Sequence, residues 1–134
     1  MTDLRAATQL ELQTYQRVLQ TSLLSPAART TIARLQGNVE AHARALAPLV
    51  NAPDRLAHTQ LRSEEDCLRL LTAAADISIG ACYAALERLT DPGAVRKTIE
   101  VMASEAQQRA VLGELLHPGD IKKVLPGSRL IGVG

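Results

Sequence analysis

The chain is nearly devoid of aromatic side chains, since its 134 residues include no Phe, no Trp and only two Tyr. Aromatic residues are among those that favour strands, so this composition argues against a β-sandwich or a β-barrel. Modules that bind single-stranded nucleic acid stack the bases on aromatic side chains. The scarcity of aromatic side chains therefore argues against that class as well.

The chain also lacks an excess of charge of either sign. Fifteen basic and fourteen acidic residues give a formal net charge of +1. This small charge argues against binding to DNA or to an anionic membrane, which normally requires a strongly basic surface. No stretch approaches the roughly 18 to 20 consecutive apolar residues that favour a membrane span. Residues 1–5 do not begin a secretory signal of charged and then apolar residues. We therefore expect a cytoplasmic protein with no nucleic-acid partner and no membrane span.

Cysteine is scarce too, with Cys67 and Cys82 as its two members. On one helix these positions lie roughly 22 Å apart, because each residue adds 1.5 Å of rise. Two thiols at that separation cannot form a disulfide with each other. We expect two reduced, buried thiols, as is usual in cytoplasmic proteins.

What the chain has in abundance is Ala and Leu, with 21 residues of each. Both are strong helix formers, so the composition predicts an all-α protein. A chain of this length normally forms one domain. Proline, glycine and short polar segments divide the chain into four predicted helices, over residues 3–23, 25–49, 63–89 and 91–116.

Three of these helices begin with recognisable capping residues. Ser25 and Asp91 are each followed by proline, which is favoured at the first helical position. Ser63 is followed by three acidic residues, which complement the positive end of the helix dipole. The short links before Ser25 and Asp91 predict two tight helical hairpins.

Long helices joined in this way predict an antiparallel four-helix bundle over residues 1–119. The longer connection over residues 51–62 must join the two hairpins, and we expect it to cross along the bundle. The segment 120–134 is rich in glycine and is predicted to be an extended tail.

Polar residues interrupt the apolar stripe of each helix at one position: Glu11, His42, Asp76 and Glu105. An ionised acid buried alone is costly, so such a group is normally paired, protonated or bound to a metal. One such residue on each helix is the pattern of a carboxylate metal site in a bundle core.

The chain resembles the ferritin-like superfamily, and especially short bacterial ferritin-like domain proteins related to rubrerythrin. The resemblance covers most of the chain and implies a ferritin-like four-helix bundle. Its motifs are Leu23-Leu24-Ser25-Pro26-Ala27, His42-Ala43-x-Ala45-Leu46, Arg62-Ser63-Glu64-x-Asp66, Asp76 with Tyr83, Leu89-x-Asp91-Pro92, Met102-Ala103-x-Glu105-Ala106-Gln107 and Leu125-Pro126-Gly127.

The resemblance implies a two-iron site whose ligands are a Glu, a Glu-x-x-His, a second Glu followed by a Tyr, and a second Glu-x-x-His. On this pattern the first, second and fourth helices keep Glu11, His42 and Glu105, and the third helix has the shorter Asp76. These four residues are the predicted metal ligands.

Two positions depart from that pattern. Val39 stands where the glutamate of the second helix belongs, and Gln108 replaces the histidine of the fourth. Val is no ligand and Gln is a poor one for iron, so three carboxylates and one imidazole remain. This oxygen-rich set favours at most a single Fe or Mn ion.

Other interpretations stay open. The polar residues can instead form a metal-free network in which His42 pairs with Glu105 or Glu11, with Tyr15, Tyr83 and Gln108 around them. In that case the positions of Val39 and Gln108 open a pocket for a small molecule, with or without catalysis. A third interpretation is a homodimer or larger homo-oligomer that serves as an interaction module.

Overall fold

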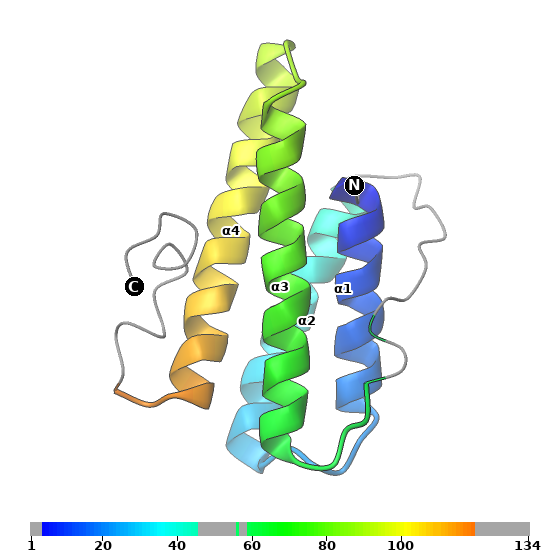
Figure 1. Cartoon of the computed structure of the whole chain (residues 1–134), viewed down its shortest axis with the longest axis vertical. Coiled ribbons are helices and arrows are strands. Elements are labelled where there is room, and N and C mark those ends of the chain that lie inside the picture. The colour runs from blue at the N-terminus through cyan, green and yellow to red at the C-terminus, as the bar shows by residue number, and fades with distance from the viewer. Residues whose placement is uncertain (1–3, 46–55, 57–58, 120–134) are drawn as a thin grey trace.

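The computed structural model describes residues 4–45, 56 and 59–119, which form four α-helices (Figure 1). They are α1 (Leu4–Leu19), α2 (Pro26–Ala45), α3 (Glu64–Leu86) and α4 (Pro92–Leu116). The predicted all-α bundle is confirmed. The predicted tail 120–134 and most of the predicted connection 51–62 lie outside the described residues.

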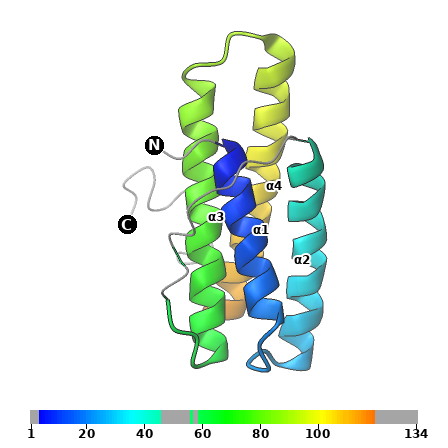
Figure 2. The same ribbon diagram turned by 90° about the vertical axis from the view of Figure 1, so that its right-hand side faces the viewer.

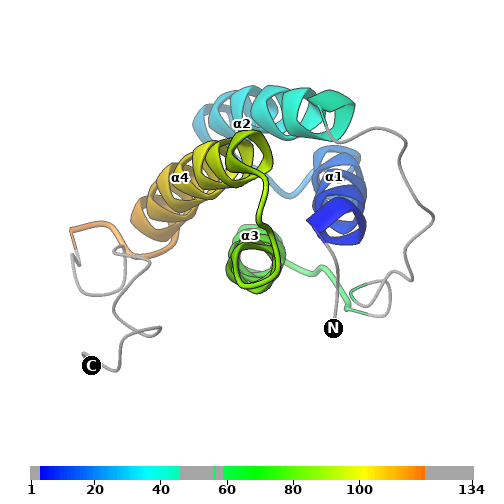
Figure 3. The ribbon, with the colours of Figure 1, turned by 90° about the horizontal axis from the view of Figure 1, so that it is seen from above.

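The four helices pack in a ring. α3 packs against both α1 and α4, and α1 also packs against α2, whereas the contact that closes the ring between α2 and α4 is the sparsest of the four. The view along the bundle shows this order of neighbours (Figure 3). Each helix therefore turns one face towards a common core.

The direction of the helices follows from contacts near their ends. The backbone N–H of Ser25, just before α2, donates to the carboxylate of Glu64 at the start of α3. Both helices thus begin at the same end of the bundle and run parallel, while α1 and α4 run the opposite way (Figure 2). The 20 residues of α2 span about 30 Å, so the end of α2 lies about that far along the bundle from the start of α3.

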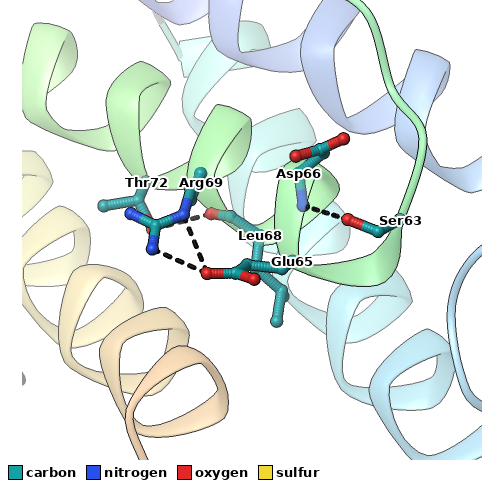
Figure 4. Close-up of polar contacts among 6 residues, drawn as sticks. All are labelled: Ser63, Glu65, Asp66, Leu68, Arg69 and Thr72. Atoms are coloured by element: carbon teal, nitrogen blue, oxygen red, sulfur yellow. Dashed lines mark hydrogen bonds and ion pairs between the residues drawn. The ribbon is translucent and has the colours of Figure 1, made fainter.

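Capping side chains set the helix starts as the sequence predicts. The hydroxyl of Ser63 accepts a hydrogen bond from the backbone N–H of Asp66 at 3.1 Å, as Figure 4 shows. A carboxylate oxygen of Asp91 accepts from the N–H of Ala94 at 2.8 Å. These bonds satisfy N–H groups that have no partner within the helix.

The apolar core fills the part of the bundle near the α1–α2 turn. Its fully buried members come from all four helices and include Tyr15, Ile32, Leu71 and Leu112. The α3–α4 hairpin continues beyond the ends of α1 and α2 (Figures 1 and 2). Close packing of all four helices is therefore confined to the region that they share.

α3 is long and apolar enough, by length and composition alone, to cross a membrane. The core helix of a soluble protein meets the same criteria. In this bundle the inner face of α3 is buried against α1 and α4, through residues such as Leu71, Ala75 and Cys82.

Candidate functional site

Two glutamates from different helices meet inside the bundle. Glu11 of α1 is 0% exposed and Glu105 of α4 is 1% exposed, and their carboxyl groups lie within hydrogen-bonding reach of each other. One oxygen of each, Oε2 in both cases, is buried without a hydrogen-bond partner among the described residues. The pair is the centre of the candidate site.

Burial raises the pKa of the Glu11 carboxyl well above its ordinary value of 4.5. Loss of hydration is the largest cause, and the charge of Glu105 and its hydrogen bond with Glu11 act in the same direction. A hydrogen bond from Ser78 opposes the shift, because its hydroxyl donates to Oε1 of Glu11 at 3.3 Å. Two carboxylates this close cannot both ionise cheaply, so the pair retains a proton.

His42 of α2 lies at the edge of this pair. Its Nδ1 is 3.4 Å from Oε1 of Glu105, a close contact without the geometry of a hydrogen bond. The side chain is 16% exposed, so the imidazole connects the buried pair with the surface. Three of the four predicted site residues, Glu11, His42 and Glu105, are therefore brought together.

The fourth, Asp76 of α3, does not join them. Its side chain is 47% exposed, and its Oδ1 accepts a hydrogen bond from Nε of Arg109 at 2.9 Å. The prediction that Asp76 belongs to the centre is therefore wrong. Two residues along a helix turn a side chain by about 200°, so Ser78, and not Asp76, faces Glu11.

Cys82, one turn after Ser78, belongs to the same surroundings. Its side chain is fully buried. Burial raises the pKa of the Cys82 thiol to about 12, with further contributions from the charges of Glu105 and Glu11. The sequence predicts a buried thiol at Cys82, which is confirmed, but the position of Cys82 beside the acids is not among its predictions. The apolar rhythm of α3, in which Ser78 and Cys82 are four residues apart, was the available signal.

The residues predicted to surround the site divide into two groups. Tyr15 is fully buried, and its hydroxyl donates to Oε1 of Gln108, itself 1% exposed, at 3.4 Å. Val39 is fully buried in the apolar core. Tyr83, by contrast, is 50% exposed, so its predicted place beside the acids is wrong. A shift of one position from Cys82 rotates its side chain by about 100°, away from the core.

The donor chemistry of the centre bears on whether it suits a metal. Carboxylate oxygens and a neutral imidazole suit Mn or Fe(II), and the Oε2 atoms of Glu11 and Glu105 can accept a cation once the pair loses its proton. Among the described residues, however, no three His, Cys, Asp or Glu side chains are gathered as ligands around one point. A dinuclear set does not fit, because Val39 and Gln108 stand at two positions where the predicted two-iron pattern requires ligands, and Asp76 faces Arg109.

The chain matches no protein-family model, no curated protein and no solved structure.

Proposed function

We propose that this protein is a ferritin-like bundle whose carboxylate centre is reduced to one that binds at most a single Fe or Mn ion. The path of the chain supports the ferritin-like assignment. α2 and α3 are parallel, so two antiparallel hairpins are joined by one long connection, which is the arrangement of ferritin-like bundles. Up-and-down bundles, with only short loops, lack that connection.

The observation that carries the metal proposal is the buried pair of Glu11 and Glu105 with its unpartnered oxygens. Buried polar atoms without partners are costly, and a cation placed between two carboxylates would satisfy them. His42 is the third donor. Because the three side chains do not surround one point, their rotamers must change on binding, and we expect the affinity to be modest.

Such an ion would supply one-electron redox chemistry at the carboxylates. The residues themselves would orient it: Glu11 and Glu105 neutralise its charge, the Ser78 hydroxyl holds Oε1 of Glu11, and Tyr15 with Gln108 excludes water on one side. The absence of further anionic donors in this group limits the centre to one divalent ion.

The proposal is tested by titrating metal-depleted protein with Mn(II) and following free Mn(II) by electron paramagnetic resonance. We expect saturation at no more than one ion per chain. Loss of a residue that only hydrogen-bonds to a metal ligand lowers the metal affinity about 10–100-fold. Because Glu105 and His42 are proposed as ligands themselves, Glu105→Gln and His42→Ala should each lower the affinity for Mn(II) at least as much.

Asp76→Asn and the exposed Glu100→Gln are the matched controls, since each removes one carboxylate charge outside the centre. Both should bind Mn(II) like the wild type. Equal weakening by Asp76→Asn and Glu105→Gln would indicate non-specific attraction to acidic residues. Absence of saturable binding to the wild-type protein would leave a metal-free polar core as the correct description.

The cytoplasmic location and the homo-oligomeric state remain predictions. Two large apolar side chains on the α3–α4 hairpin, Tyr83 and Ile99, are about half exposed. They are the residues to mutate if light scattering shows a dimer, and a chain shortened before residue 120 tests whether the tail takes part.

A further inference from the structure

A small polar cavity lies between α3 and the C-terminal part of α4, separate from the Glu11–Glu105 pair. Its volume is about 180 Å³. Pockets for drug-sized ligands measure roughly 300–1,000 Å³, so only a small ligand fits here. Its walls are Arg69, Thr72, Ala73 and Asp76 of α3, with Arg109, Leu116 and His117 opposite.

The notable group in this wall is the guanidinium of Arg109, because its side chain is only 8% exposed. A guanidinium offers five N–H donors. The Nε of Arg109 donates a hydrogen bond to Oδ1 of Asp76. The two terminal nitrogens of Arg109 have no hydrogen-bond partner among the described residues. A buried cation with unused donors lining a cavity is a receptor for an anionic acceptor.

The charges around the cavity select the kind of anion. Arg69 and Arg109 are positive and Asp76 is negative, so the charged walls sum to +1 by 2 − 1. Arg69 is further compensated by Glu65, at 2.6 Å, and the carbonyl end of α4 lies nearby, where the helix dipole disfavours anions. A monoanion is therefore favoured over a dianion such as sulfate.

The remaining walls select its shape. Leu116 and Ala73 supply an apolar side, and the cavity holds about six water-sized volumes, at roughly 30 Å³ each. We propose that this cavity binds a short-chain monocarboxylate, with the carboxylate on the terminal nitrogens of Arg109 and the alkyl group against Leu116. The proposal is independent of metal binding at Glu11 and Glu105.

The test is titration of chelator-treated, full-length protein with butyrate, followed by NMR chemical shifts. Saturable shifts are expected at residues of the cavity, and butyramide, which lacks the charge, should bind at least about tenfold more weakly. Sulfate, a dianion, should produce no saturable shift at the same ionic strength.

Two variants probe the cavity in different ways. Arg109→Gln removes the cation, and Ala73→Leu fills the space while keeping every charge, so each should weaken butyrate binding at least about tenfold. Arg34→Gln, at an exposed position on α2, is the control and should bind butyrate normally. If Arg109→Gln unfolds the chain, Ala73→Leu still decides the question.

Unsaturable butyrate shifts in the wild type, or normal binding by folded Ala73→Leu, would overturn the proposal. Equal binding of butyrate and butyramide would also overturn it, because the role of the guanidinium would then be absent.

Discussion

The buried carboxyl pair predicts how stability depends on pH, and Glu11→Gln isolates the effect. Glu11 keeps its proton in the folded, metal-free protein because burial and Glu105 raise its pKa, whereas in the unfolded chain it titrates near its ordinary value of 4.5. The folded state therefore binds one more proton than the unfolded state above that pH. Gln has nearly the shape of a protonated Glu and cannot titrate.

The sign and the size of this pH dependence follow from the linkage between proton binding and folding. A raised folded-state pKa gives stability that is fully present below the unfolded pKa and is lost as the pH rises through the folded pKa. One retained proton corresponds to about 1.4 kcal/mol per pH unit. Between pH 5.5 and 7.5 the wild type should thus lose up to about 2.7 kcal/mol relative to Glu11→Gln.

The assay is urea unfolding at a series of pH values in the presence of a chelator. The titration of groups common to both proteins largely cancels in the difference between the two free energies of unfolding. Glu100→Gln, at an exposed position, is the control, and its curve should run parallel to that of the wild type. If the Glu11→Gln curve is also parallel to the wild type, the folded pair holds no proton and the reasoning is refuted.

Three further predictions concern the rest of the bundle. Ile32→Ala removes a fully buried core side chain and should cost about 2–5 kcal/mol in urea unfolding, where a cost below 1 kcal/mol would show a loose core. Asp91→Ala removes the cap of α4 and should cost about 0.5–2 kcal/mol, while Asp91→Asn should cost less. Cys82, with a thiol pKa of about 12, should be alkylated at pH 8 far more slowly than in urea, and equal rates would contradict its burial.

The helix pattern could be predicted from the sequence because its signals are local. Ser25, Ser63 and Asp91 cap helices through bonds that span three residues, and such signals can be read directly. The end of α1 is different. It was expected near residue 23 but lies at Leu19, whose carbonyl accepts from Arg29 of α2 at 2.7 Å. A contact from another helix thus replaces the helical bond.

The centre could be predicted only where the register of a helix was unambiguous. Glu11, Glu105 and His42 each interrupt an apolar stripe, and all three meet in the fold. On α3, residue type alone favours Asp76, because it is the acid that interrupts the apolar stripe. Ser78 continues the spacing set by Leu71 and Cys82, and periodicity was the stronger physical criterion.

Two buried residues without charge, Val39 and Gln108, explain how the core tolerates its buried acids. Val39 adds apolar packing where the related pattern has an acid, and Gln108 accepts from Tyr15 without adding charge. The buried pair then needs only one proton to hold a single negative charge, with His42 beside it. The core beside Ser78 and Cys82 can bury a single negative charge at a tolerable cost in free energy. A core with four ionised carboxylates would fold only with bound cations. Under the proposed function, this small set of donors would hold at most one ion.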